Sequence, residues 1–342
     1  MTTTSFRREV QEHPAVLREL IAHYRGDGQQ LLQDWASRAV KAGRVLFSGM
    51  GASEYPPEAI FADLSANGVD ASTADAGELI HYPQSQSGLV TLISQSGESI
   101  ETRKLAERFA GTELAVIVNN EDSAMGRSAG LVLPMLAGSE STISTKTYSN
   151  TQAVLYLMAQ AVKGQGAIES GLAELERLAT AIAVYNEADI EHAARLLSDA
   201  SCLHMISRGP ALVAAKQCAL TFMEGPRLNT AAFTGGAFRH GPFEVIEDGH
   251  RCIFLIPQGN TKDLLQGMAT EVAQMGSQVV VITNTDLNLP EACVVLDVPA
   301  CCEMLFPLAA ATTHGLLADS IARLRGLRTG DFRYGGKVTE RE

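Results

Sequence analysis

Short apolar, β-branched runs alternate with longer helical patterns along both halves of the 342-residue chain. Runs of this kind are typical of strands that are buried on both faces of a parallel sheet. The candidates are residues 45–47, 90–93, 114–118 and 131–133 in the first half, and 203–206, 252–256, 279–283 and 294–296 in the second. Helical patterns such as 101–110 and 152–162 lie between or after them. This alternation predicts an α/β fold with parallel, doubly wound sheets.

The second series of strands repeats the first. The run LAVIVNN at 114–120 corresponds to VVVITNT at 279–285, and fifteen residues separate Asn119 from Pro134 just as fifteen separate Asn284 from Pro299. Two copies of one α/β unit explain both features. We therefore expect an N-terminal helical segment at 1–29, a first domain at 30–165, a connecting helix at 166–199, a second domain at 200–327 and a tail at 328–342. The connecting stretch is rich in charge and alanine, which favours packed rather than flexibly tethered copies.

Composition narrows the possible partners. The net charge of −12 argues against a surface that binds the nucleic-acid backbone. The sequence has no apolar run of signal-peptide type at its start and none long enough to span a membrane, so we expect a cytoplasmic protein without a membrane partner. Six cysteines and eight histidines form no CxxC, HxH or HExxH pattern and no zinc-finger spacing, so we expect free thiols and neither a metal nor a cofactor.

The most polar loop reads SQSGES and occupies residues 94–99, between the strand that ends near Ile93 and the helix that begins near Ile100. Its hydroxyls and amide, its glycine and the free N–H groups of the following helix would suit an anion such as a phosphate. The alternative is that Ser99 merely caps the helix, with acidic residues favouring the first turn. Similar polar loops lie at 48–53 and 139–147, and neither a GxGxxG nor a P-loop pattern is present.

The second half carries the candidate proton-transfer groups. Glu224 precedes Gly-Pro, and His240 follows it sixteen residues later in the run FRHGPF. A carboxylate and an imidazole can share general acid and base work. Each residue alone is more commonly a solvated helix end or loop residue, and Lys337 near the chain end is more commonly a solvated lysine.

Together these motifs resemble the paired sugar isomerase (SIS) domains, most closely the isomerase half of glucosamine-6-phosphate synthases. The resemblance covers the chain from about residue 30 to its end and rests on ordered motifs: SQSGES at 94–99, SESTISTKTYSNTQ at 139–152, ALTFMEG at 219–225, FRHGPFEVIED at 238–248 and GGKVTE at 335–340. It implies two tandem SIS domains, each a parallel five-stranded sheet in a three-layer αβα sandwich of flavodoxin type.

The resemblance also implies roles for individual residues. The sugar phosphate would be held by Ser94, Gln95, Ser96 and Ser99, with Ser53 and Ser144 nearby. Glu224 would move a proton between C1 and C2 of the open-chain sugar, His240 would open the ring, and Lys337 would close over the site. In the family the histidine comes from the neighbouring subunit, so a homodimer is implied.

Two departures bear on the activity. The chain begins Met-Thr-Thr-Thr, without an N-terminal cysteine or a glutaminase segment, so we expect that it is not a complete synthase. The family's helix lysine, three residues before the glutamate, is Thr221 here, which weakens the case for imine chemistry in the synthase direction. We therefore expect aldose–ketose isomerisation coupled to amine release from an amino-sugar or amino-linked ketose 6-phosphate, as in glucosamine-6-phosphate deaminases. The alternatives are a deglycase of the fructoselysine 6-phosphate type and a non-catalytic phosphosugar-binding regulator.

Overall fold

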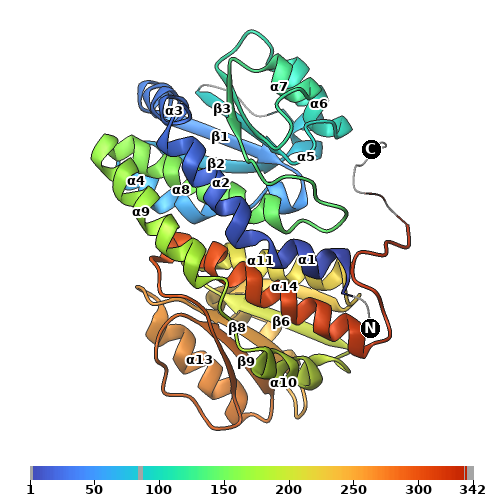
Figure 1. The fold of residues 1–342 in the computed structure, drawn as a ribbon. Coiled ribbons are helices and arrows are strands. Elements are labelled where there is room, and N and C mark those ends of the chain that lie inside the picture. Colours follow the sequence, from blue (N-terminus) through green and yellow to red (C-terminus); the bar gives the residue numbers. More distant parts are fainter. Residues whose placement is uncertain (1–2, 84–87, 335, 337–342) are drawn as a thin grey trace. The chain divides into compact units, whose positions relative to one another are not determined.

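The computed structural model describes residues 3–83, 88–334 and 336 of the chain (Figure 1). These residues divide into two compact units, each built around one sheet. We call Pro14–Glu140 together with Lys146–Ala179, Tyr334 and Gly336 the first-sheet unit. The second-sheet unit comprises residues 3–13 together with Ser141–Thr145 and Thr180–Arg333.

The first sheet has five parallel strands in the order β2-β1-β3-β4-β5. They are β1 (Arg44–Gly49), β2 (Asp70–Asp75), β3 (Leu89–Ser94), β4 (Leu114–Val118) and β5 (Leu131–Pro134). The helices of this unit are α2 (His13–Arg25), α3 (Gln29–Ala42), α4 (Phe61–Ala66), α5 (Ala76–His81), α6 (Ile100–Arg108), α7 (Ala124–Ser128), α8 (Lys146–Lys163) and α9 (Gln165–Ala181), with 3₁₀ turns η1 (Gly51–Ser53) and η2 (Pro56–Ile60).

Helices pack on the first sheet through large apolar side chains. Trp35 of α3 is fully buried, its ring lies 6.2 Å from that of Phe47, and its indole N–H donates to Thr91 Oγ1 at 3.1 Å. A second cluster joins α5, α6 and α7 to the alternate residues of the strands, with Leu105 and Leu92 among its members. Burying a side chain of this size stabilises the fold by about 1.5–3 kcal/mol.

The second sheet repeats this topology. Its order is β10-β9-β8-β6-β7. When β6 to β10 are matched to β1 to β5, this is the order of the first sheet read from its other edge. The strands are β6 (Cys202–Ser207), β7 (Asn229–Thr234), β8 (Arg251–Ile256), β9 (Gln278–Thr283) and β10 (Val294–Asp297). The predicted repeat and the α/β fold of two five-stranded parallel sheets with flanking helices are therefore confirmed.

The helices of the second-sheet unit are α1 (Ser5–Gln11), α10 (Glu187–Leu197), α11 (Leu212–Glu224), α12 (Gly235–Arg239), α13 (Lys262–Gln274) and α14 (Phe306–Leu324), with 3₁₀ turns η3 (Gly209–Ala211), η4 (Pro242–Val245) and η5 (Glu303–Leu305). Figure 1 shows α11 and α14 on one side of β6 and β8 and α13 on the other. The core on the α13 side includes Leu265, Val272 and Phe254.

The apolar pattern found eight of the ten strands, because each of those eight contains an apolar run. It missed β2 and β7, whose sequences DASTAD and NTAAFT are mostly half-buried or exposed. Each of them pairs with one neighbour only, β1 or β6, at the edge of its sheet. The opposite edge strands, β5 and β10, were found because they carry the apolar runs LVLP and VVLD, which β2 and β7 lack.

The segment between the sheets forms two helices, α9 and α10, instead of one. α10 begins after Asn186, whose side-chain oxygen accepts the N–H groups of Ala188 and Asp189, as an N-cap residue does. All six cysteines are free thiols. Among the described residues, no helix is long and apolar enough to cross a membrane.

Candidate functional site

The SQSGES loop lies where the sequence placed it, at the carboxyl edge of the first sheet. β3 ends at Ser94, the loop follows, and α6 begins at Ile100. The neighbouring strand β1 is parallel to β3, with Ser48 opposite Leu92, so the two loops that follow these strands leave the sheet at the same edge. In open α/β sheets, ligands bind at this edge.

The serines organise the loop backbone from within. Ser94 is buried, and its Oγ accepts the Gly97 N–H at 3.0 Å, while Ser96 Oγ accepts the Glu98 N–H at 3.1 Å. Each hydroxyl that accepts such a bond keeps its own proton for donation. Both side chains can therefore hold the loop in shape and still donate to a phosphate oxygen.

Gly97 fixes the turn of the loop. Its φ is +66°, a conformation that other residues rarely adopt, and a Cβ built on it would clash with Ser123 Oγ and lie 2.6 Å from Ser123 Cβ. Ser123 belongs to the loop after β4 and caps α7 by accepting the Gly126 N–H at 3.2 Å. The SQSGES loop therefore packs against the loop that follows β4, and only glycine fits at the contact.

Further bonds tie the loops of the first sheet together. Glu98 Oε1 accepts the Ala124 N–H at 2.8 Å, and the Gly97 carbonyl accepts the Met125 N–H at 3.2 Å. Asn119 bridges to the loop after β5, accepting the Ala137 N–H and donating to the Gly138 carbonyl, both at 2.8 Å. The edge is thus a set of cross-linked loops, which preorganises it for a ligand.

Ser99 occupies the N-cap position of α6 but makes no side-chain capping bond. Its Oγ instead pairs with Thr102 Oγ1 at 2.6 Å, and its carbonyl accepts bonds from the Arg103 N–H and the Thr102 hydroxyl. The alternative that Ser99 caps the helix through its side chain is therefore not supported by a hydrogen bond. The first N–H groups of α6 remain suited to an anion.

Ser53 ends the 3₁₀ turn η1, directly after β1. The turn passes close to the sheet, because a Cβ on Gly49 would lie 2.6 Å from the Ser53 carbonyl oxygen and 2.9 Å from that of Ile93. The loop after β1 is thus packed against the end of β3, where the SQSGES loop starts.

The equivalent loop of the second sheet, PQGNT at 257–261, differs in charge. Gly259 corresponds to Gly97, but the space above it is filled by the carboxylate of Glu303, which a Cβ on Gly259 would overlap. A carboxylate at this point disfavours an anion. The position of Glu303 is thus a second difference between the two loops, beyond the missing hydroxyls.

Glu224 is the last residue of α11, half-buried, at the start of the turn to β7. One turn earlier on this helix, Thr221 is buried and its Oγ1 accepts from Gln217 Nε2 at 3.2 Å. Gln217 Nε2 also lies 3.4 Å from the carbonyl oxygen of Ser144. The segment 141–145, predicted as part of the phosphate site, thus lies along α11 in the second-sheet unit.

The turn after Glu224 gathers three segments that are far apart in the sequence. A Cβ on Gly225 would lie 3.1 Å from Thr329 Cγ2 and 3.7 Å from Ile143 Cδ1, and one on Gly330 would lie 2.6 Å from Thr142 Oγ1. Arg227 Nη2 donates to the carbonyl of Asp331 at 2.5 Å. The start of the C-terminal tail is therefore anchored beside the candidate carboxylate. Lys337, further along this tail, lies outside the described residues.

His240 lies at the other edge of the second sheet. α11 runs antiparallel to β6, so Glu224 at its end reaches the amino edge, whereas His240 follows β7 and α12 at the carboxyl edge. The 13 residues of α11 alone span about 20 Å. His240 is exposed, and its N–H donates to the Ala237 carbonyl at 3.2 Å. One chain therefore does not place both groups on one small substrate.

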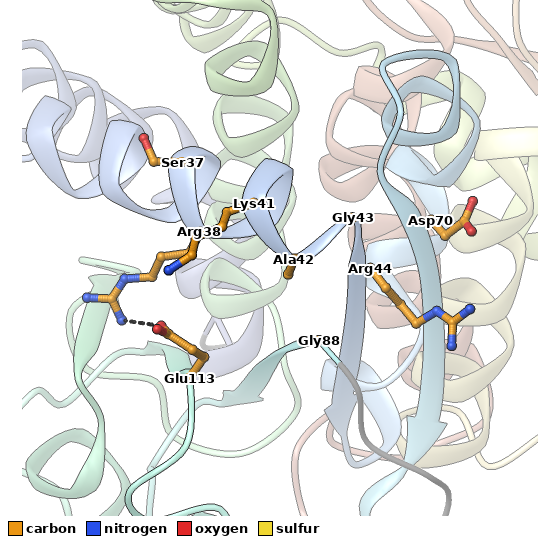
Figure 2. Close-up of a pocket in the computed structure, with 9 residues that line it drawn as sticks. All are labelled: Ser37, Arg38, Lys41, Ala42, Gly43, Arg44, Asp70, Gly88 and Glu113. Carbon is orange, nitrogen blue, oxygen red and sulfur yellow. Dashed lines mark ion pairs between the residues drawn. The ribbon is translucent and has the colours of Figure 1, made fainter.

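A pocket of about 630 Å³ lies at the amino edge of the first sheet, the edge opposite to the SQSGES loop (Figure 2). Arg38, Lys41 and Arg44 line it together with Asp70 and Glu113, and Arg38 pairs with Glu113 at 3.5 Å. The mixture of charges, and the absence of any predicted site residue from its lining, separate this pocket from the candidate site.

Comparison with known proteins agrees with this architecture. Residues 196–300 match the SIS domain. Over 343 aligned residues it is 29% identical to glutamine–fructose-6-phosphate aminotransferase [isomerizing] from Zymomonas mobilis, covering 94% of this chain and 56% of that protein. The chain thus spans about half the length of the curated relatives that it matches.

Solved structures share the fold. The C-terminal domain of glucosamine-fructose-6-phosphate aminotransferase from Francisella tularensis superposes with a TM-score of 0.87 at 19% identity, covering 96% of this chain and 98% of that one. Glucosamine-6-phosphate deaminase from Thermotoga maritima gives 0.74 at 16% identity, covering 99% and 100%. The resemblance inferred from the motifs is confirmed, with the aminotransferase C-terminal domain among the matches.

Sequence reasoning missed the residues that support the site. Ser123, Asn119 and Gln217 hold the loops and α11 in place, but none belongs to a motif that suggests chemistry. Asn119 carried a detectable signal, since it and Asn284 occupy matching places in the repeat. Asn284 accepts the Gln258 N–H at 2.7 Å, so both copies use this amide to bridge loops.

Proposed function

We propose that this protein is an enzyme that binds a sugar 6-phosphate at the SQSGES loop and moves a proton between C1 and C2 of the open-chain sugar, with release of an amine. For glucosamine 6-phosphate, the overall reaction consumes one water and yields fructose 6-phosphate and ammonia. The observation that carries the proposal is the loop itself. Gly97 is held by its positive φ and by Ser123, and the hydroxyls of buried Ser94 and half-buried Ser96 lie just before a helix N-terminus.

In this proposal Glu224 is the proton carrier. A single carboxylate can take a proton from one carbon and return it to the next through an enediol, provided that the substrate is held at its phosphate end. The turn at Gly225, close to Thr329, gives the carboxylate a fixed backbone. Lys337 would close over the site. His240 would serve in ring opening.

We further propose that the working unit is a homodimer in which a second copy supplies His240. The support is geometric, because Glu224 and His240 of one chain lie at opposite edges of the second sheet. Mixing inactive Glu224→Gln and His240→Asn proteins after dissociation would restore about one quarter of wild-type activity, since random pairing makes half of the dimers mixed and one of their two sites native. If His240 acted within its own chain, mixing would restore nothing.

A deglycase that acts on an amino-acid-linked ketose phosphate is the second candidate. It is favoured by Thr221, which is buried and bonded to Gln217 where the family's synthases have a lysine amine. Assays for free ammonia from glucosamine 6-phosphate and for free lysine from fructoselysine 6-phosphate separate the two activities. Tight binding of these compounds without turnover of either would instead indicate a phosphosugar-binding regulator and overturn the enzyme proposal.

A further inference from the structure

Two thiols and two imidazoles meet on neighbouring strands of the second sheet. Cys202 and His204 are alternate residues at the start of β6, while His250 directly precedes β8 and Cys252 is the second residue of that strand. The strands are parallel, with His204 opposite Cys252. In sequence the two pairs are mirror images, Cys-x-His and His-x-Cys, so the sheet brings four metal-ligand side chains to one face.

The four side chains are in contact in a row. Cys202 Sγ lies 3.7 Å from His204 Nε2, His204 Nδ1 lies 2.9 Å from His250 Nε2, and His250 Nδ1 lies 3.4 Å from Cys252 Sγ. In a tetrahedral zinc site, with Zn–N near 2.0 Å and Zn–S near 2.3 Å, neighbouring ligand atoms are about 3.3–3.8 Å apart. The observed contacts involve both nitrogens of each ring, so they show that the four side chains lie together but are not the ligand separations of one formed centre.

We propose that Cys202, His204, His250 and Cys252 form a binding site for a thiophilic divalent cation of the zinc class. Among the described residues, no group of three or more His, Cys, Asp or Glu side chains is placed to hold a metal ion as it stands. In this row, both nitrogens of each ring contact a neighbouring side chain. Rotation of the two imidazoles would turn one nitrogen of each toward a shared centre. Two thiols and two imidazoles are the ligand set that zinc prefers in closed sites, and each bound thiol would give its proton to water.

A disulfide does not fit this arrangement. The register places Cys202 two residues before the partner of Cys252, so their Cα atoms are separated by about 8 Å on the diagonal between strands. A disulfide needs less than about 7 Å. A metal ion spans this gap, because both histidines reach into it.

The surroundings favour a partly dry site. The ring of His204 lies 5.6 Å from those of Phe233 and Phe238, and Cys252 is fully buried, whereas Cys202 and His250 are half-buried and leave a path from solvent. The nearest cation on the strand, Arg251, is held by Asp199 at 2.6 Å and by the Leu196 carbonyl at 2.8 Å.

The test uses Co²⁺, whose bonds to thiolate give a characteristic charge-transfer absorption. The full chain, treated with a chelator and dialysed, is titrated with Co²⁺ as wild type, Cys202→Ser and His250→Gln. The controls are Cys293→Ser, a half-buried thiol elsewhere in the unit, and His192→Gln on the exposed surface of α10. We expect one equivalent bound by wild type and controls, and at least tenfold weaker binding with reduced absorption in Cys202→Ser and His250→Gln.

Two results would overturn the inference. One is the absence of thiolate absorption when wild type is mixed with stoichiometric Co²⁺ at neutral pH. The other is absorption that survives unchanged in both ligand variants, which would place the metal at other thiols such as the adjacent pair Cys301 and Cys302. Circular dichroism of each chelator-treated variant establishes that it is folded. Should Cys202→Ser fail to fold, wild type and His250→Gln still decide the outcome.

Discussion

Replacing Gly97 by alanine tests whether the SQSGES loop is a rigid, built anion site. The added methyl group would be forced into Ser123, with its carbon 2.6 Å from Ser123 Cβ and 3.0 Å from Val118 Cγ2. These separations are well below ordinary van der Waals contact. Either Ser123 or the loop must therefore move.

The magnitude follows from two contributions. Holding alanine at a φ of +66° costs about 1–2 kcal/mol, of which roughly 0.4–1 kcal/mol is offset because alanine also restricts the unfolded chain. Displacing Ser123 removes its cap on α7, a loss of about 1 kcal/mol. We expect the free energy of unfolding of the first-sheet unit to fall by about 2 kcal/mol.

Gly111→Ala is the matched control. Gly111 also has a positive φ, +82°, in the turn between α6 and β4, but nothing lies within 4 Å of its Cβ position. It reports the conformational cost alone, about 1 kcal/mol or less. The assay is urea unfolding followed by tryptophan fluorescence, since Trp35 is in the first-sheet unit, together with calorimetric titration of fructose 6-phosphate.

We expect Gly97→Ala to bind fructose 6-phosphate at least tenfold more weakly than wild type, and Gly111→Ala to bind it normally. The reasoning is refuted if Gly97→Ala matches Gly111→Ala in both stability and affinity. That outcome would mean that the contact with Ser123 does not shape the loop.

Three further substitutions test other parts of the structure. Ser94→Ala leaves the Gly97 N–H without its acceptor, so we expect the free energy of unfolding in urea to fall by about 1–3 kcal/mol and phosphosugar binding in calorimetry to weaken. Unchanged stability and affinity would contradict the loop geometry. Arg227→Met removes the bond to the Asp331 carbonyl, so we expect a lower kcat in steady-state assays with unchanged stability of the first-sheet unit, and an unaltered kcat would argue against the tethered tail. Burial lowers the pKa of His314 from 6.5 to about 3, so below pH 6.5 the unfolded state binds more protons than the folded state. The free energy of unfolding therefore falls as the pH drops from 6.5 toward 3, by about 2 kcal/mol between pH 7 and 5. Urea unfolding of His314→Gln should lack this contribution, and equal slopes in the two proteins would refute it.

The sequence was informative where chemistry and burial leave a local trace. β4 is apolar throughout because it is buried on both faces. The SQSGES loop, with its hydroxyls and its glycine, is recognisable from six consecutive residues. β2 and β7 were missed because DASTAD and NTAAFT consist mostly of small and polar residues, without a continuous β-branched apolar run. The family resemblance, not the pattern, supplied the fifth strand of each sheet.

Features that depend on contacts between distant segments could not be predicted. Gly97 and Gly259 are both glycines after matching strands, yet one lies under a serine hydroxyl and the other under the carboxylate of Glu303. The residues near either glycine in the sequence do not predict that difference. Likewise, the separation of Glu224 from His240 becomes visible only once α11 is known to run back along the sheet.

The most direct test of the central claim is exchange of the sugar's carbon-bound hydrogen with solvent. Wild type and Glu224→Gln are incubated with fructose 6-phosphate, and with the amino-sugar phosphate that the assays select, in D₂O, and the label at C1 and C2 is followed by NMR. The account predicts deuterium at these carbons with wild type, and none with Glu224→Gln although that variant still binds the sugar phosphate. Equal exchange by both proteins, or binding by wild type with no exchange at all, would contradict the account.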